Sequence, residues 1–218
     1  MNRFIIWICK FIPKIISNSF LIFCLQVMRR LQRHGDMFVI GNGSRKWESD
    51  GFIENQHSMK DINIGMAPMS ETGCEVIATY NALLNLGKSP SLGKLIEEYE
   101  RDGIIHSGRF GVAPKAIADN LKRHGLGVDF YIPGKKRQDV EGFSAKYNTL
   151  IVTYYNDYTD LYKQIHTVAI TRDDSGYTLH NAYCNGRISK AQATIMEAIG
   201  SVTAGMGRPI ILIGIKDK

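Results

Sequence analysis

The sequence is poor in cysteine, and its four cysteines lie far apart. Cys9, Cys24, Cys74 and Cys184 form no C-x-x-C pair, so the sequence offers neither a disulfide framework nor the ligand spacing of a zinc ribbon. A chain of 218 residues can bury a core without disulfides or a structural metal. We therefore expect a folded protein in a reducing compartment, with no metal and no cofactor.

The sequence also lacks the broad basic surface of a nucleic-acid-binding protein. The net charge of +6 is concentrated in residues 1–36, which hold six Lys or Arg residues and one acid. Residues 37–218 hold 21 basic and 20 acidic residues, a near balance that argues against a nucleic-acid partner. With no internal repeat or low-complexity tract, we expect an apolar and basic segment over 1–36 and one domain over 37–218.

Residues 4–28 are strongly apolar, but they do not form an uninterrupted hydrophobic run. Lys10, Pro13 and Lys14 lie within the segment, and each lysine near the middle of a spanning helix costs about 2.5 to 3.5 kcal/mol on the insertion scale. A spanning helix is therefore disfavoured. The segment also lacks a small-residue cleavage site after its apolar region, which argues against a secretory signal.

A helix lying in the membrane interface suits the same segment better, with the arginines after it near anionic headgroups. Its polar side chains fall on one helix face: Lys10, Lys14, Ser17 and Asn18. We expect a cytoplasmic location, with the inner face of the membrane as a partner surface for residues 4–28. Two alternatives stay open, a helix packed on the domain and residues upstream of a start at Met28 or Met37.

One cysteine lies where a buried helix is predicted to begin. The apolar residues of 76–84 recur at helical spacing, and Gly87 ends the pattern. Thr72 and Glu75 match a capping box, which would place Cys74 in the first helical turn. There the helix dipole and the unpaired backbone N–H groups favour a thiolate. Such a cysteine can instead be a small core side chain. Whether Cys74 is catalytic therefore depends on which residues later in the chain could act with it.

The remaining pattern places helices first and an antiparallel sheet second, which is the order of an α+β protein. Further helices are predicted from Ser91 to Gly103 and from Pro114 to Gly125, and a short helix is predicted to begin at a Ser189–Gln192 capping box. Extended segments are indicated by β-branched and aromatic residues or by alternation: Met37–Ile40, 128–132, 149–155, 166–171, 177–181 and 209–215.

Two predicted neighbouring strands carry residues that could serve a cysteine nucleophile. His166 begins one strand and Asn181 ends its hairpin partner, so the two side chains can meet across the sheet. A thiolate needs a base that takes its proton and returns it to the leaving group, and the imidazole needs a group that fixes its tautomer. Cys74, His166 and Asn181 could fill these catalytic roles. His180 is expected to point to the opposite face of its strand from Asn181.

This order of cysteine on a helix, histidine on a strand and Asn on the next strand resembles the papain-like cysteine peptidases. Within them the chain is similar to the bacterial peptidases that remove double-glycine leaders from bacteriocins, and to their stand-alone relatives. The resemblance spans about 63–215 as an ordered pattern and includes Thr72-Gly73-Cys74, Asn85-Leu86-Gly87, the helix pair through Gly111 to Gly125, and His166-Thr167-Val168-Ala169-Ile170. It implies a papain-like fold, with the nucleophile helix packed against an antiparallel sheet.

The chain departs from that family at two positions. The leader peptidases usually carry an Asp where Asn181 stands here. They also place a Gln shortly before the nucleophile as an oxyanion donor, and residues 68–72 contain none. Asn63 or Gln56 would have to fold back to replace it, because losing one oxyanion donor costs ~100-fold or more in rate.

The resemblance implies a cysteine peptidase that cleaves a peptide or isopeptide bond of a peptide or protein substrate through a thioester acyl-enzyme. Cys74 would attack, His166 would relay the proton, and Asn181 would orient the imidazole. The alternatives are a catalytically lapsed domain that binds a peptide or leader segment, and a related acyl transfer such as transglutamination or deamidation.

Overall fold

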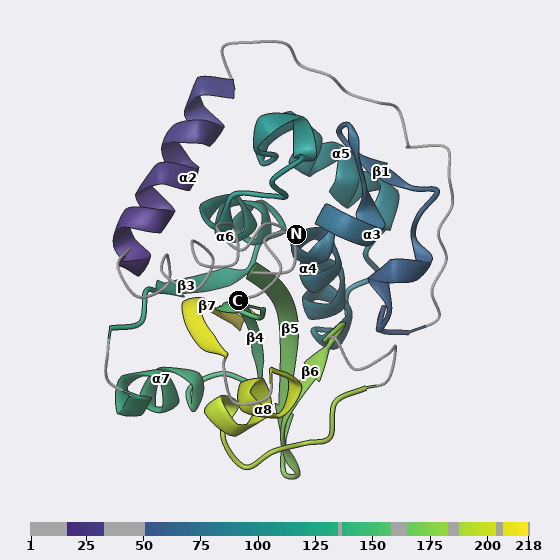
Figure 1. Cartoon of the computed structure of the whole chain (residues 1–218). Helices are drawn as coiled ribbons and strands as arrows, with labels where there is room; N and C mark the ends of the chain where they lie inside the picture. The colour runs from purple at the N-terminus through teal and green to yellow at the C-terminus, as the bar shows by residue number, and fades with distance from the viewer. Residues whose placement is uncertain are drawn as a thin grey trace.

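A computed structural model describes residues 17–32, 51–134, 137–157, 165–182, 188–203 and 207–217. Its centre is a five-stranded antiparallel sheet in the order β3-β7-β4-β5-β6 (Figure 1). The strands are β3 (Gly127–Tyr131), β4 (Thr149–Tyr155), β5 (Ile165–Asp173), β6 (Gly176–His180) and β7 (Arg208–Lys216). All five were predicted from the sequence to within a few residues. The predicted strand at Met37–Ile40 lies outside the described residues.

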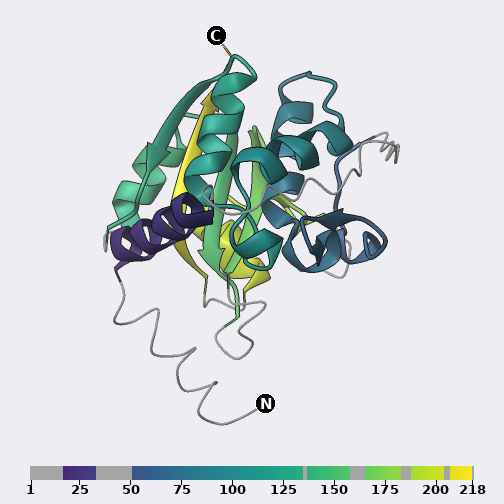
Figure 2. The ribbon, with the colours of Figure 1, turned by 90° about the horizontal axis from the view of Figure 1, so that it is seen from above.

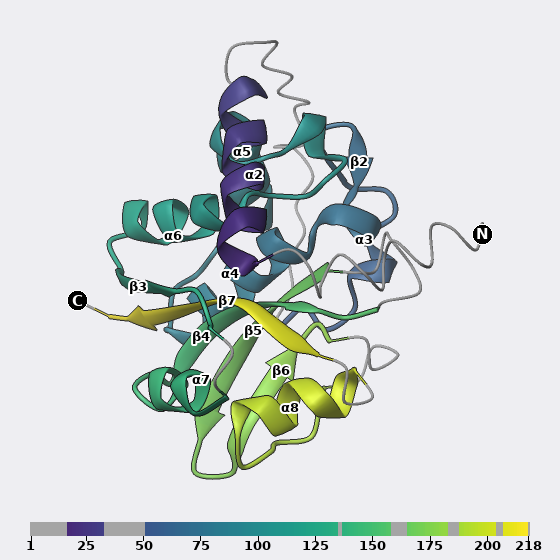
Figure 3. The same ribbon diagram turned by 60° about the vertical axis from the view of Figure 1, so that its left-hand side comes forward.

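Helices cover both faces of this sheet, so the central strand β4 is buried along its whole length. Ile151 and Tyr155 of β4 join the core formed with α4 (Cys74–Asn85), α5 (Leu92–Asp102) and α6 (Pro114–Arg123). Leu150 and Val152 point to the other side, into the core formed with α7 (Arg137–Ser144) and α8 (Ile195–Val202). Figure 3 shows the two helical layers with the sheet between them. The α+β class with an antiparallel sheet is thus confirmed.

Both predicted capping boxes are wrong, although the helices that they were meant to begin exist. The N-cap of α4 is Gly73, with no side-chain cap bond, because a short helix α3 (Met69–Thr72) runs directly into it and the Thr72 hydroxyl donates to Pro68 O at 3.4 Å. Ser189 instead exchanges hydrogen bonds with the backbone of β6. The capping box of α8 is formed by Thr194 and Glu197.

Residues 51–68, which carry no clear sequence period, form short elements beside α4: the 3₁₀ turn η1 (Gln56–Ser58) and a small hairpin of β1 (Asn63–Ile64) and β2 (Ala67–Pro68). Asn81 of α4 holds this lead-in segment, because its side chain accepts from Ile53 N at 2.8 Å and donates to Ile53 O at 2.9 Å. The lead-in segment, taken below as residues 51–58, therefore follows α4 towards the end of β6.

The N-terminal helix α2 (Asn18–Gln32) packs on the far side of the helical layer from α3 (Figures 1 and 2). The sequence pattern places Asn18 on the polar face of an interfacial helix, but in the structure this residue does not face solvent. Asn18 is buried and donates to the carbonyls of Pro133 and Pro209, each at 3.2 Å. Within the described ranges, no helix has both the length and the apolar character needed to cross a membrane.

Candidate active site

Cys74 is the first residue of α4, as predicted, and its side chain is buried. The tight junction with α3 requires glycine at position 73, since a Cβ there would lie 2.7 Å from the backbone oxygen of Met69 as well as 2.5 Å from its sulfur. The thiol lies against Thr167 of β5, whose backbone N–H and hydroxyl both favour its charged form. Residues of opposite parity on a strand point to opposite faces, so Thr167 and Ala169 face α4, whereas the side chain of His166 leaves β5 on the other face, beside Tyr154.

The electrostatic environment of Cys74 differs from the one expected at a helix N-terminus. Burial raises the pKa of the Cys74 thiol well above its ordinary value, and the neighbouring Glu75 carboxylate raises it further. The contacts with Thr167 lower it, but burial has the larger effect. In this conformation Cys74 is therefore a neutral thiol, and the expectation of a thiolate stabilised by the helix dipole is wrong for it.

His166 is buried at the start of β5, where its ring meets Tyr154 edge to face. Its Nε2 lies 2.7 Å from the backbone oxygen of Asn181. A carbonyl can only accept, so Nε2 must carry the hydrogen, and in the neutral ring Nδ1 is left as the basic nitrogen. Burial lowers the pKa of His166 to about 4, the bond to Asn181 opposes this, and nearby His57 lowers it slightly further.

Asn181 does meet His166, but through its main chain rather than its side chain. The residue has a left-handed backbone with φ of 62°. Its side-chain oxygen accepts from Gln56 N at 3.0 Å, and its side-chain nitrogen donates to Gln56 Oε1 at 2.9 Å. The predicted role of orienting the imidazole is thus compatible with the geometry, with the backbone carbonyl as the orienting group.

Gln56 connects Asn181 to the residues that precede Cys74. Its side chain is buried, and its Nε2 donates to Ser70 O at 3.2 Å. Asn63, the other amide considered from the sequence, lies exposed in β1 opposite Pro68. Gln56 is therefore the amide that folds back towards the start of α4, although it precedes Cys74 by 18 positions in the sequence.

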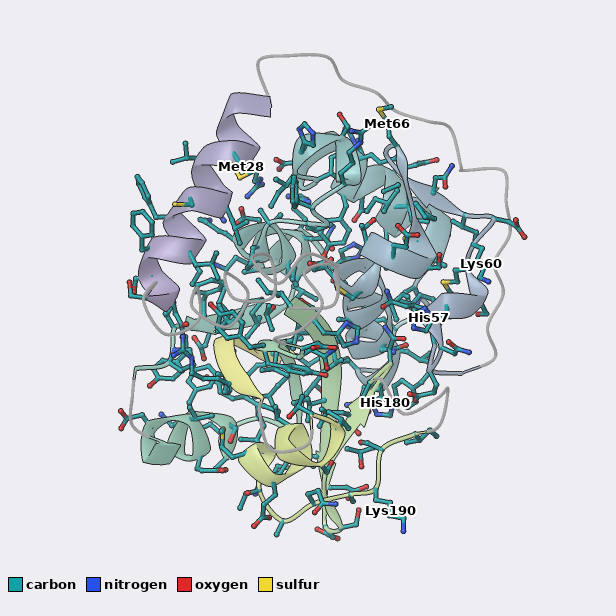
Figure 4. The ribbon with its side chains drawn as sticks, in the orientation of Figure 1. Met28, His57, Lys60, Met66, His180 and Lys190 are labelled. Atoms are coloured by element: carbon teal, nitrogen blue, oxygen red, sulfur yellow. The ribbon has the colours of Figure 1, made fainter. Side chains whose placement is uncertain are left out.

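A second polar group of the lead-in segment, which no sequence pattern predicts, lies beside Asn181. Glu54 accepts from Asn181 N at 2.9 Å, and its other oxygen lies 2.6 Å from His180 Nδ1. The ring of His180 stacks on Phe52 at 3.9 Å between centroids, and its Nε2 lies 3.0 Å from the hydroxyl of Thr171. Figure 4 shows His180 near the end of β6, beside the segment that carries His57. Glu54 thus joins the side chain of His180 to the backbone of Asn181, and the expectation that the two side chains point to opposite faces stays a prediction.

Glu75 is the other titratable residue beside Cys74. Burial raises the pKa of its carboxyl group to about 7, opposed by hydrogen bonds that include one from the backbone of Val112. Gly111 makes room for this carboxyl group, since a Cβ there would lie 2.9 Å from Glu75 Oε2. The sequence pattern assigned Glu75 to a helix cap, whereas in the structure its side chain points inward and is buried.

The structure thus brings His166 and Asn181 into contact and places the Cys74 thiol against Thr167, the residue that follows His166. Among the contacts of the described residues there is no hydrogen bond between the thiol and the imidazole. In the same described part of the chain, no cluster of three or more His, Cys, Asp or Glu side chains could hold a metal ion. Comparisons of the chain with protein-family models, curated proteins and solved structures gave no match.

Proposed function

We propose that this protein is a papain-like cysteine peptidase that cleaves a peptide or isopeptide bond through a thioester acyl-enzyme. The observation that carries the proposal is the bond from His166 Nε2–H to Asn181 O, 2.7 Å long, one residue away from the contact between Thr167 and the Cys74 thiol. It leaves Nδ1 as the base for a nucleophile at the start of α4. The substrate is a peptide or protein.

In the reaction, the Cys74 sulfur attacks the carbonyl carbon of the substrate while its proton passes to His166 Nδ1. The imidazolium then gives this proton to the departing amine, and a thioester with Cys74 remains. Water loses a proton to His166 as it attacks the thioester, which releases the acid and restores the thiol. Asn181 O stabilises the imidazolium through the Nε2–H bond.

Because His166 leaves β5 on the face opposite Thr167 and the thiol, substrate binding has to turn the imidazole around the start of β5 and bring Nδ1 to Cys74 before a proton can pass between the two neutral groups. The negative oxygen of the tetrahedral intermediate needs donors. The backbone N–H of Cys74 offers one, and the side-chain amide of Gln56 offers a second if its bond to Ser70 O is exchanged for the substrate.

A catalytically lapsed domain that binds a peptide is the second candidate. The observation in its favour is the pair of opposed pKa shifts, which keep the thiol of Cys74 and the imidazole of His166 neutral. An ion pair would shift both values in the opposite sense. In that case the residues around Cys74 would still bind a peptide, while the Cys74 thiol would not react with it.

A peptide ending in Gly-Gly-vinyl sulfone separates the two candidates, since a vinyl sulfone is attacked by a thiol that an adjacent base activates. The full chain is incubated with the probe at neutral pH and its cysteines are mapped by mass spectrometry. We expect an adduct at Cys74 that falls at least ~100-fold in His166→Ala and persists in the control His124→Ala, which alters a histidine paired with Glu98 instead.

Cys24, on α2, reports unspecific labelling in the same spectra. Equal labelling of Cys74 in the wild type and in His166→Ala would contradict the peptidase. Binding of the matching unreactive peptide without any Cys74 adduct would support the lapsed domain instead. If the chain neither reacts with the probe nor binds the peptide, neither candidate acts on Gly-Gly peptides.

A further inference from the structure

Helix α2 has an inner face that is fixed to the body of the protein. Ile22 is buried in the core, and the guanidinium of Arg29 lies 2.8 Å from Asp102 Oδ1 and 3.3 Å from Asp119 Oδ2. Arg29 also donates to Asp102 O at 2.8 Å. With Asn18 bonded near the other end of the helix, both ends are held. The rotation of α2 about its own axis is therefore set by contacts with the body.

The opposite face of α2 presents large apolar side chains to solvent. Phe20 is 55% exposed, Phe23 62%, Val27 36% and Met28 38%. Positions 20, 23 and 27 repeat at three and four residues and so form one stripe along the helix. A stripe of this kind, rimmed by polar residues, is typical of a surface that binds a partner or a membrane.

We propose that this outer face of α2 docks on an anionic lipid surface, with Phe20, Phe23, Val27 and Met28 entering the headgroup region. The charge of this part of the chain favours an anionic lipid surface as the partner, because residues 1–32 contain no acidic residue and five basic ones. Arg29 is already paired with Asp102 and Asp119. The other four basic residues of this sequence have no acidic residue among 1–32 to balance them, and each basic residue near an anionic surface contributes about 1 kcal/mol.

The two other occupants are less favourable for the same reason. A second copy of the chain would bring a second basic 1–32 sequence, without any acidic residue, to the first. Residues 1–16 of the same chain are basic too, with no acid among them. Either arrangement would cover the apolar stripe but place like charges side by side, which costs free energy.

The proposed docking face is far from the candidate active site. Figure 4 shows Met28, on α2, well separated from His57, which lies near the site. The contacts described above for Cys74, His166 and Asn181 are with residues of β4, β5, β6, α4 and the lead-in segment. A protein held through α2 would therefore keep the candidate site free of the lipid, facing peptides that reach the membrane surface.

Vesicle cosedimentation of the full chain tests the proposal, with phosphatidylcholine vesicles that contain or lack phosphatidylglycerol. The test variant is Phe20→Ser with Phe23→Ser. The matched control is Phe110→Ser with Ile188→Ser, because these side chains are similarly exposed, at 61% and 58%, and lie elsewhere. We expect the wild type and the control to bind the anionic vesicles, and the test variant to bind at least ~10-fold less.

A second variant, Lys10→Glu with Lys14→Glu, keeps the apolar stripe and reverses the charge. It should also lose binding at low salt, and raised salt should weaken the wild type. The proposal fails if the wild type does not bind anionic vesicles, if the test variant binds as well as the control, or if vesicles without phosphatidylglycerol bind equally. A dimer in sedimentation equilibrium that only the test variant loses would identify a second copy as the occupant, and would also overturn it.

Discussion

Asn181 shows how a single backbone conformation serves the candidate site. Its φ of 62° lies in the left-handed region, which costs a residue with a Cβ about 1 kcal/mol or more. The bonds of its side chain to Gln56 and of its N–H to Glu54 hold it there. The result is a carbonyl group aimed at His166 Nε2. The lead-in segment therefore acts on the histidine through the conformation of one residue.

Asn181→Gly separates the roles of the carbonyl and the side chain, since glycine adopts the left-handed region without strain. We expect the variant to keep the Nε2–H tautomer of His166, seen in ¹⁵N chemical shifts, and to label with the vinyl sulfone within about tenfold of the wild type. Asn181→Ala, which is strained in this conformation, is the comparison. A loss of labelling in Asn181→Gly as complete as in His166→Ala would assign the orienting role to the side chain.

At the scale of elements, the sheet and the longer helices were predictable because their signals are local. The run from Thr149 to Tyr155 is β-branched or aromatic at nearly every position and forms a strand buried on both faces. Ser91, Pro114 and Gly125 mark the ends of α5 and α6 as predicted. The predictions failed where helices adjoin, since α3 removes the need for a cap at Thr72.

The candidate site was predictable only in part, because its remaining contacts join residues far apart in the sequence. Cys74, His166 and Asn181 carry recognisable chemistry in recognisable elements. Gln56 and Glu54 lie in a segment without periodicity, and their partner Asn181 follows them by 125 and 127 positions. No local sequence pattern predicts hydrogen bonds between residues so far apart. The burial that sets the pKa values of Cys74 and His166 is likewise a property of the packed fold.

Helix α2 gives a test of its docking at the element scale. Arg29 is buried while its partners Asp102 and Asp119 are partly exposed, so we expect Arg29→Ala to lower the free energy of unfolding by about 2 kcal/mol. Lys115→Ala is the control, because Lys115 is an exposed partner of the same Asp119 and should cost less than about 0.5 kcal/mol. Urea denaturation measures both, and equal values would show that Arg29 does not hold α2.

At the scale of the whole molecule, two buried groups give the stability opposite dependences on pH. The pKa of Glu75 is raised from 4.5 to about 7, so the folded protein favours its neutral form, and that stability is lost as the pH rises from 4.5 through 7. The pKa of His166 is lowered from 6.5 to about 4, so the contribution of His166 to the stability of the protein is lost as the pH falls from 6.5 through 4. Between pH 4.5 and 6.5 the two effects oppose each other.

Replacing Glu75 with glutamine removes one of these effects and leaves the other. Glutamine resembles the neutral carboxyl group in shape and does not ionise. The unfolding free energy of Glu75→Gln should therefore increase relative to that of the wild type as the pH rises. A shift from 4.5 to about 7 corresponds to a relative gain of about 2.5 kcal/mol in unfolding free energy between pH 5 and pH 8. Denaturant titrations of both proteins at these two pH values measure it.

Glu71→Gln, at an exposed position, serves as the control, and its unfolding free energy relative to the wild type should be almost the same at the two pH values. If Glu75→Gln behaved like that control, Glu75 would be charged throughout this range, and the thiol of Cys74 would lie beside a permanent negative charge.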